Sequence, residues 1–178
     1  MSNYRILIAG GGTGGHLFPA LAIGEEIHRR EPEAKIHYVG SRFGMEARVF
    51  PVKDVWHTLL PIRGFQRGIS FQSIGRNFLL PVRIILSWLK MNSLIKDFAP
   101  QVVVGTGGYA AALPLYLASK RDKPLPIVLQ EQNSIPGITT RWFAEKAKTI
   151  CVAFNEANDA INSETILTGN PVRKDITE

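Results

Sequence analysis

A glycine-rich loop directly after a short apolar run is the feature that most constrains the fold of this chain. Residues 4–9 form a strand-like apolar run, residues 10–15 contain five glycines, and residues 17–30 then show helical spacing. Pro19 is expected in the first turn of that helix, where its missing N–H costs nothing. Glycines let a backbone approach a ligand closely, and a helix N-terminus carries a partial positive charge. The order of strand, glycine loop and helix therefore predicts an anion-binding βα unit.

The same alternation continues along the chain. Further strands are expected at residues 35–39, 55–60, 101–104, 126–129, 149–153 and 165–167, and helices at residues 71–98, 110–119 and 136–145. The segment at 71–98 is expected to be interrupted near Pro81. Nearly continuous apolar strands that alternate with helices are typical of a parallel, doubly wound sheet. The predicted fold class is therefore α/β, with a Rossmann-like and mostly parallel sheet.

Length and composition favour one globular domain. The chain has 178 residues, of which 45% are hydrophobic and 20% are charged, and this excludes a disordered chain. The single cysteine, Cys151, excludes a disulfide framework and a multi-cysteine zinc site. The longest apolar region, residues 78–89, is interrupted by polar residues and is too short to span a membrane. With no targeting segment visible, a soluble or peripheral protein is expected.

Three unusual loops each follow a predicted strand, at residues 10–16, 105–109 and 130–133. Ligands bind outside the carboxyl ends of strands in open α/β sheets, so these loops are expected to converge on one cleft. Two of the loops are glycine-rich, which predicts a diphosphate or a sugar diphosphate as the ligand. The third contains Glu131, Gln132 and Asn133, and three polar residues exceed what capping of the next helix by Asn133 or Ser134 requires.

His16 ends the first glycine loop and is expected on the first turn of the following helix. The positive helix end disfavours the imidazolium form, so a neutral ring could accept a proton as a general base. A histidine that only packs or donates a hydrogen bond is the alternative. The other three histidines show no ligand spacing, so no protein-held metal is expected.

A dinucleotide-binding module is a second interpretation of the first loop. Glycines at positions 10, 12 and 15 satisfy the pattern G-x-G-x-x-G, but the second strand ends without the carboxylate that binds the ribose of NAD. Arg42 could instead accept the 2′-phosphate of NADP, which leaves an NADP-binding Rossmann module as an alternative. A P-loop is excluded because no Gly-Lys-Ser/Thr sequence follows the glycines.

The net charge of +6 arises from one block, residues 55–96, which contains no Asp or Glu. Basic residues mixed with large apolar residues favour an anionic membrane surface over nucleic acid, and no nucleic-acid partner is expected. A core helix with a solvated basic face is the alternative. The residues expected to dock on the membrane are Arg67, Arg76, Phe78, Arg83 and Trp88.

Four motifs together resemble the MurG family of peptidoglycan glycosyltransferases. Residues 11–22 are similar to the N-terminal signature of this family, and residues 105–109, 130–137 and 169–173 match its later motifs in order. The family has the GT-B architecture, in which two Rossmann-like domains enclose the active site. The resemblance implies that residues 1–168 form the N-terminal domain, which faces the acceptor and the membrane. Residues 169–178 would begin the interdomain linker, and the donor domain is absent.

The resemblance also implies an activity and a set of site residues. The activity is inverting transfer of N-acetylglucosamine from UDP-GlcNAc to the muramoyl 4-hydroxyl of undecaprenyl-linked lipid I, giving lipid II. The reaction would need no cofactor and would take place at the cytoplasmic face of the bacterial inner membrane. The candidate catalytic residues are His16 as the base and Glu131 as a second base or the orienter of His16. The implied donor contacts are Thr13, Gly14, Gly15, Asn133 and Arg173. The implied contacts to the acceptor diphosphate are Gly12, Gly107, Gly108, Tyr109 and Gln132.

This half of the enzyme is expected to be inactive alone. A membrane-anchoring subunit of a two-chain glycosyltransferase is a further interpretation of the same resemblance.

Overall fold

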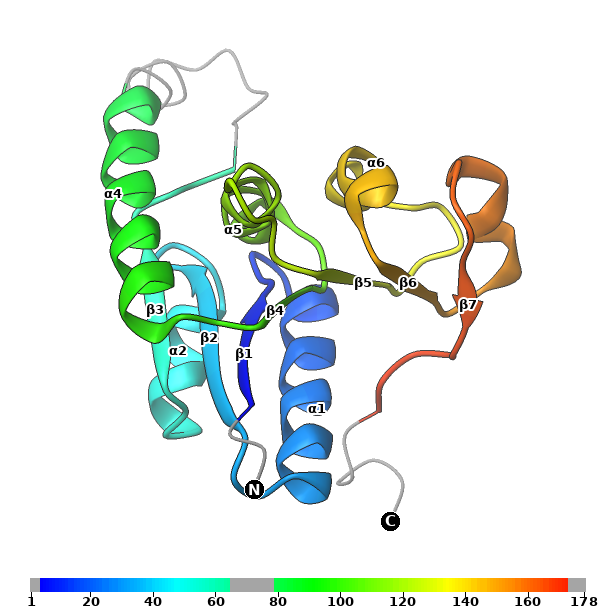
Figure 1. Cartoon of the computed structure of the whole chain (residues 1–178), viewed down its shortest axis with the longest axis horizontal. Helices are drawn as coiled ribbons and strands as arrows, with labels where there is room; N and C mark the ends of the chain where they lie inside the picture. The colour runs from blue at the N-terminus through cyan, green and yellow to red at the C-terminus, as the bar shows by residue number, and fades with distance from the viewer. Residues whose placement is uncertain (1–3, 65–78, 173–178) are drawn as a thin grey trace.

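A computed structural model describes residues 4–64 and 79–172, whose strands form one parallel sheet (Figure 1). The strands are β1 (Arg5–Ala9), β2 (Lys35–Ser41), β3 (His57–Leu60), β4 (Val102–Gly105), β5 (Ile127–Glu131), β6 (Thr149–Val152) and β7 (Ile166–Leu167). They lie in the order β3-β2-β1-β4-β5-β6-β7, and each neighbouring pair is parallel. The strand order turns back between β1 and β4, which is the switch point of a doubly wound sheet. The predicted fold class is therefore confirmed.

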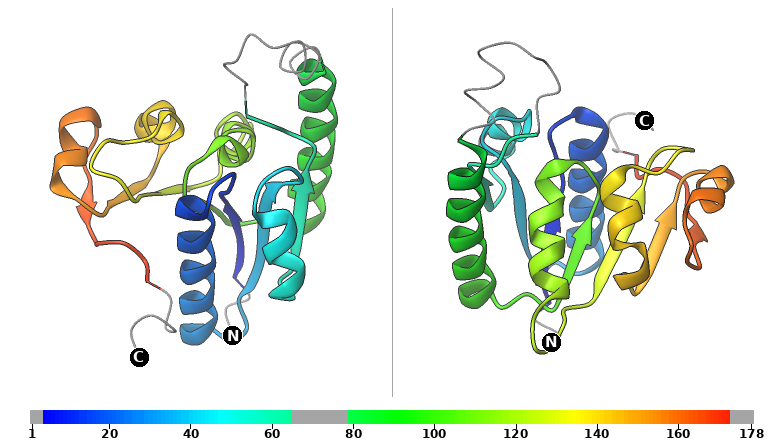
Figure 2. Two further views of the ribbon diagram at one scale, coloured as in Figure 1. Left: turned by 180° about the vertical axis from the view of Figure 1, so that it is seen from behind. Right: turned by 90° about the horizontal axis from the view of Figure 1, so that it is seen from above.

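Helices cover both faces of the sheet. The helices are α1 (Gly14–Arg30), α2 (Glu46–Val52), α4 (Leu80–Phe98), α5 (Tyr109–Ser119) and α6 (Ile138–Phe143), with the 3₁₀ turns η1 (Ala144–Lys146) and η2 (Asn155–Ala160). Helices α1 and α2 lie on one face, and α4, α5 and α6 lie on the other (Figure 2). The helices connect parallel strands by crossovers, so the carboxyl ends of all the strands lie along one edge of the sheet.

Alternating side chains of the strands supply two separate cores. In β1, Leu7 and Ala9 pack toward Met91 of α4 and Leu115 of α5, whereas Ile6 and Ile8 belong to the core that contains the α1 and α2 side chains. Successive side chains of a strand point to opposite faces, so a strand buried on both faces is apolar at every position. This explains the continuous apolar runs of the sequence.

Helix boundaries differ from the sequence prediction in several places. Helix α1 begins at Gly14 rather than at residue 17, so Pro19 lies inside the helix and the prediction of a first-turn proline was wrong. Pro81 is the second residue of α4, and because residues 71–78 lie outside the described part of the chain, the expected interruption near Pro81 stays a prediction. A proline is well tolerated at a helix start because the N–H that it lacks would have no intrahelical partner there. Helix α6 ends at Phe143 and continues as the 3₁₀ turn η1.

Helix α2 was not predicted at all. It has seven residues, carries Pro51 near its end, and buries only Glu46 and Phe50. Two buried positions in one short segment give no repeat from which helical spacing can be read.

Candidate functional site

The three loops predicted to converge lie together at the carboxyl edge of the sheet. The Nδ1 atom of His16, from the first loop, lies 2.9 Å from the carbonyl oxygen of Thr106 in the second loop. The same Nδ1 lies 3.1 Å from Oε1 of Gln132 in the third loop. The Thr106 hydroxyl donates to the carbonyl oxygen of His16 at 2.7 Å. These contacts confirm the predicted convergence.

The second glycine loop approaches the first so closely that side chains are excluded. A Cβ atom on Gly107 would lie 2.7 Å from Nδ1 of His16, and one on Gly108 would lie 2.1 Å from the carbonyl oxygen of Gly11. Both Gly107 and Gly108 also have positive φ angles, of 94° and 76°. Glycine adopts such angles without steric cost. The second loop therefore needs glycine for both its conformation and its packing.

The hydrogen bonds of His16 fix which ring nitrogen carries the proton. Both neighbours of Nδ1 are oxygen acceptors, so Nδ1 is the donor in a neutral ring. The assignment of the Gln132 side-chain amide is consistent, because its Nε2 donates to Thr106 O at 2.9 Å and to Gln130 O at 3.1 Å. Among the described residues, no hydrogen bond reaches Nε2 of His16. This leaves the lone pair of Nε2 open to a ligand.

Glu131 is buried and organises the loop that follows β5. Its side chain accepts four hydrogen bonds, from Asn133 N at 3.0 Å, Asn133 Nδ2 at 2.9 Å, Gly137 N at 3.0 Å and the Thr140 hydroxyl at 2.6 Å. No hydrogen bond joins Glu131 to His16 in the described part of the chain, and Gln132 is the side chain that contacts the ring. Helix α6 has Gly137 at its N-cap without a side-chain cap, so the capping interpretation of Asn133 and Ser134 was wrong.

A groove of about 540 Å³ lies at this edge, between α4, α5 and α6. Its polar end contains His16, Glu131 and the second glycine loop. Its apolar walls are formed by Ile62, Leu80, Ile84, Ala112, Ile138 and Trp142. A cavity with one polar end and apolar walls suits a ligand that has both characters.

Two positively charged features lie where the second glycine loop leads into α5. The helix begins at Tyr109 and has no side-chain cap, so its first N–H groups point outward. Arg63 lines the same groove, and its guanidinium lies 4.6 Å from the ring centre of Phe43. No carboxylate forms an ion pair with Arg63 within the described residues. This end of the groove can therefore bind an anion.

Tyr109 is half-buried beside this positive region. Burial raises the pKa of its phenol, and the nearby Glu46 carboxylate raises it further, while a hydrogen bond with Ser41 and the charge of Arg63 act in the opposite direction. The neutral phenol can donate or accept a hydrogen bond.

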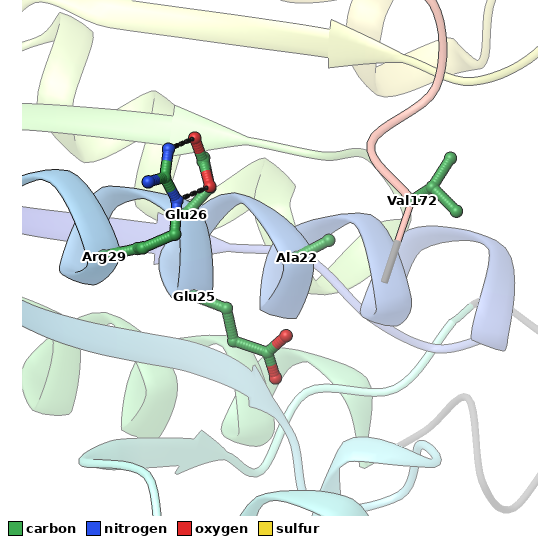
Figure 3. Close-up of a pocket in the computed structure, with 5 residues that line it drawn as sticks. All are labelled: Ala22, Glu25, Glu26, Arg29 and Val172. Carbon is green, nitrogen blue, oxygen red and sulfur yellow. Dashed lines mark hydrogen bonds and ion pairs between the residues drawn. The ribbon is translucent and has the colours of Figure 1, made fainter. Parts of the chain in front are cut away.

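Of the predicted donor contacts, Thr13, Gly14 and Gly15 lie at the start of α1, and Asn133 lies in the loop after β5. Thr13 is the N-cap of α1 and makes no side-chain cap, and Thr13, Gly15 and Asn133 are exposed while Gly14 is partly buried. Arg173 lies outside the described residues. The preceding residue, Val172, lines a pocket beside α1 together with Ala22, and the paired side chains of Glu26 and Arg29 lie further along the helix (Figure 3).

Of the predicted membrane-docking residues, Arg67, Arg76 and Phe78 lie outside the described residues. Arg83 is partly buried, 4.9 Å from the ring centre of Phe43, and Trp88 is exposed. The apolar side chains exposed at the start of α4 are those of Leu79, Val82, Ile84, Ile85, Leu86 and Leu89. None of the helices in residues 4–64 and 79–172 has the length and hydrophobicity needed to cross a membrane. The described part also holds no cluster of three metal-ligating side chains.

Sequence reasoning missed three residues of this region. Glu46 hydrogen-bonds to Gly12, Arg63 lines the groove, and Thr106 joins the first two loops. Thr106 lay within a predicted loop and could have been found there. Glu46 and Arg63 carry no local signal, because their role depends on packing between segments far apart in the sequence.

Comparison with known proteins gives one consistent result. The glycosyltransferase family 28 N-terminal domain matches residues 6–152. The UDP-N-acetylglucosamine–N-acetylmuramyl-(pentapeptide) pyrophosphoryl-undecaprenol N-acetylglucosamine transferase of Christiangramia forsetii is 40% identical over 97% of the chain and 46% of that protein. The transferase of the same name from Amoebophilus asiaticus is 41% identical over 98% of the chain and 47% of that protein. The chain thus spans about half the length of these relatives.

Solved structures agree on the fold. The crystal structure of MurG from Acinetobacter baumannii superposes with a TM-score of 0.73 at 23% identity, covering 98% of this chain and 47% of that one. A glycosyltransferase structure from Rickettsia africae gives a TM-score of 0.52 at 14% identity, covering 87% and 38%. The described chain therefore has the fold of one half of such proteins.

Proposed function

Because the chain belongs to the glycosyltransferase family 28 N-terminal domain, we propose that it forms the acceptor-binding half of an inverting glycosyltransferase. The reaction transfers N-acetylglucosamine from UDP-GlcNAc to the muramoyl 4-hydroxyl of undecaprenyl-linked lipid I and gives lipid II. The names of the relatives that are about 40% identical support this choice of substrates over a dinucleotide. Residues 169–178 begin the connection to a donor-binding domain, which supplies the second wall of the cleft.

The state of His16 is the observation that carries the proposal. Its Nδ1 proton is directed at Thr106 O and Gln132 Oε1, which leaves Nε2 as the acceptor of a ring that lines the groove. Direct displacement at the anomeric carbon needs a base that takes the proton of the attacking hydroxyl. His16 performs this step, Gln132 and Thr106 orient its ring, and Glu131 holds the loop that carries Gln132.

The acceptor diphosphate binds at the start of α5. The amides of Gly107, Gly108 and Tyr109 lie at an uncapped helix N-terminus, and the guanidinium of Arg63 lines the same groove. Amide donors and a guanidinium together suit a diphosphate, because both kinds of donor match its oxygen acceptors. Gln132 contributes by orienting His16 rather than by a charge.

The donor nucleotide sugar binds at the rim of the same edge. Thr13, Gly14 and Gly15 lie at the uncapped start of α1, where free N–H groups suit the phosphates of UDP-GlcNAc. Asn133 and Arg173 complete the contacts from this domain. The donor domain supplies the remaining contacts.

The first turns of α4 form the membrane-docking surface, called the α4 surface below, with Trp88 and the apolar residues Leu79, Val82, Ile84, Ile85, Leu86 and Leu89. Its exposed apolar residues insert shallowly into the bilayer, and the basic residues of the acid-free block bind anionic headgroups at the cytoplasmic face. Leu80 and Ile84 of α4 also line the groove, so the membrane surface and the proposed acceptor site are continuous.

A transfer assay tests the proposal. A full-length transferase that contains this domain is incubated with UDP-GlcNAc and a lipid I analogue, and lipid II with an inverted anomeric linkage is expected. The 178-residue chain alone should give no product, because stabilisation of the transition state requires both walls of the cleft. The absence of lipid II from the full-length reaction, or a retained anomeric configuration, would contradict the proposal.

A further inference from the structure

A buried carboxylate with no part in the proposed reaction lies beneath the first glycine loop. Glu46, the first residue of α2, is 0% exposed. Its Oε1 accepts the N–H of Ser41 at 2.7 Å, and the N–H of Gly12 lies 3.1 Å from Oε1 and 3.0 Å from Oε2. A carboxylate is costly to bury unless its oxygens receive hydrogen bonds. The two backbone amides meet this need.

Three glycines make room for this side chain. A Cβ atom on Gly11 would lie 2.4 Å from Oε1 of Glu46, and one on Gly44 would lie 2.3 Å from Oε2. A Cβ atom on Gly40 would lie 2.3 Å from Cγ of the same side chain. Each distance is too short for a real contact, so a side chain at any of these positions would displace the carboxylate. The end of β2, the first glycine loop and the start of α2 thus form one matched enclosure.

The enclosure extends to the candidate site through Gly12. A Cβ atom on Gly12 would lie 2.6 Å from Cε1 of Tyr109, which lines the groove. A Cβ atom on Gly108 would likewise lie 2.1 Å from the carbonyl oxygen of Gly11. The two glycine loops therefore pack against each other at the residues that Glu46 holds.

We propose that Glu46 is a positioning residue that fixes the first glycine loop against Tyr109 and withdraws the Gly12 amide from ligand binding. An amide has one proton, and donation to a carboxylate leaves none for a phosphate oxygen. A negative charge beneath the loop also disfavours an anion at that point. The diphosphate is consequently held by the second loop. This inference rests on the proposed function and revises one expectation of the sequence analysis, the contact of Gly12 with the acceptor diphosphate.

The first measurement concerns the hydrogen bond itself and needs no activity. In the wild-type 178-residue chain, the amide proton of Gly12 should exchange with solvent far more slowly than that of Gly15, which has no hydrogen-bond acceptor among the described residues. Equal exchange rates at Gly12 and Gly15 would overturn the proposal.

Two substitutions refine this measurement. Glu46→Gln keeps the size of the side chain but removes its charge and replaces Oε2 by an amide group that cannot accept. Gly12 then keeps only its longer contact with Oε1, which it shares with Ser41. Exchange at Gly12 should then accelerate about tenfold, the scale of one lost charge-assisted hydrogen bond. Glu33→Gln removes one charge from an exposed turn and should leave this rate unchanged. No acceleration in folded Glu46→Gln would overturn the proposal.

The second measurement separates positioning from a purely structural role. In a full-length transferase that contains this domain, Glu46→Gln should lower kcat about a hundredfold, the usual cost of a small misplacement. The KM for lipid I should change less than about threefold. Loss of a direct hydrogen bond to the phosphate would raise this KM by more than that. Titration of the Tyr109 phenol should move to lower pH, because the Glu46 charge raises the pKa of that group.

An unchanged kcat with a released Gly12 amide would overturn the positioning role. Loss of lipid I affinity with an unchanged kcat would overturn the withdrawal of Gly12 from binding. If the wild-type transferase forms no lipid II, the proposed function fails, whereas exchange at Gly12 and titration of Tyr109 still decide the inference about Glu46.

Discussion

Globular domains usually bury apolar side chains and expose polar ones. The carboxyl edge of the sheet and the start of α4 both depart from this arrangement, in opposite ways. At the edge, polar side chains are buried, and Gln130, Glu131 and Gln132 are 3%, 2% and 9% exposed. On the α4 surface, large apolar side chains are exposed, with Val82 and Ile85 at 54% and 58%. Stability alone favours the reverse at both places. The comparison indicates that each region is shaped for something outside the domain, one for a polar ligand and the other for an apolar surface.

The two regions differ in how the domain tolerates them. The buried polar atoms at the sheet edge are hydrogen-bonded to each other, and the unpaired buried side-chain atoms of the described residues, His37 Nδ1 and Ser87 Oγ, lie elsewhere. Satisfied polar networks hold a site rigid before a ligand arrives. The α4 surface has no such internal compensation. A large apolar patch that is exposed to water typically marks a site that binds a membrane or another protein.

The largest effect is expected at the sheet edge. In a full-length transferase that contains this domain, His16→Ala should lower kcat by ~10²–10⁴, the scale of losing a general base, with a smaller change in KM. Steady-state kinetics with a lipid I analogue measure both constants. His28→Ala, at an exposed position of α1, is the control and should behave as wild type. A kcat close to wild type in His16→Ala would shift the search for the base to Glu131.

The second effect concerns stability at the same edge. Glu131→Ala leaves four donors without their acceptor, including the buried Thr140 hydroxyl. The free energy of unfolding of the 178-residue chain should fall by about 3 kcal/mol, as for other broken buried charged networks. Urea denaturation measures this change, and Glu156→Ala at an exposed position is the control. A loss no larger than that of Glu156→Ala would remove the distinction drawn between the two regions.

The α4 surface should give the opposite result, a binding defect without a stability defect. Ile85→Ser combined with Leu89→Ser removes side chains that are 58% and 53% exposed, so the unfolding free energy should hardly change. Sedimentation with anionic vesicles should weaken at least about tenfold, since each buried CH₂ contributes ~0.8 kcal/mol and the two substitutions remove several carbon atoms. Val52→Ser, on the opposite face of the sheet, is the control. Undiminished sedimentation of the double variant would place the docking surface elsewhere.

A charge-reversal variant sharpens the same point. Replacing Arg67, Arg76 and Arg83 by Glu should abolish binding to anionic vesicles, because each basic residue near such a surface contributes ~1 kcal/mol. The wild type should ignore neutral vesicles and keep some binding to anionic vesicles at high salt through its apolar residues. Sedimentation of the triple variant with anionic vesicles would show that the basic residues form only a solvated face.

The sequence predicted the parts of the molecule that depend on local patterns. The strands, the parallel sheet and the convergence of three loops follow from apolar runs and glycine clusters at their ends. His16, Glu131 and Gln132 were found because they directly follow those signals. The boundaries of α1 and α4 were less accurate, since proline marks a possible helix start only when the first helical residue is known.

The remainder depends on contacts between distant segments. The burial of Glu46 requires three glycines. Gly40 and Gly44 lie shortly before it in the sequence, but Gly11 belongs to the distant first glycine loop. Arg63 becomes part of the groove only because the segment after β3 passes Tyr109 of α5, where a Cβ atom on Gly64 would lie 3.1 Å from Cδ1 of that ring. Likewise, the hydrogen bonds of Glu131 show a carboxylate that organises its own loop, whereas the family resemblance implied a second base or the orienter of His16.

The smallest expected effect comes from a carboxylate that is exposed rather than buried. Arg29 and then Arg30 donate to Glu26 on the surface of α1, and these bonds lower the pKa of its carboxyl from 4.5 to about 2. A lowered pKa in the folded state stabilises the protein above pH 4.5, and this contribution is lost as the pH falls toward 2. Because the pair is exposed and screened by salt, the contribution is small. The urea midpoint should fall between pH 7 and pH 2.5 in both proteins. This fall should be only slightly larger for the wild type than for Glu26→Gln. If Glu26→Gln lowers the midpoint at pH 7 as much as Glu131→Ala does, burial is not what separates a structural carboxylate from a surface one in this domain.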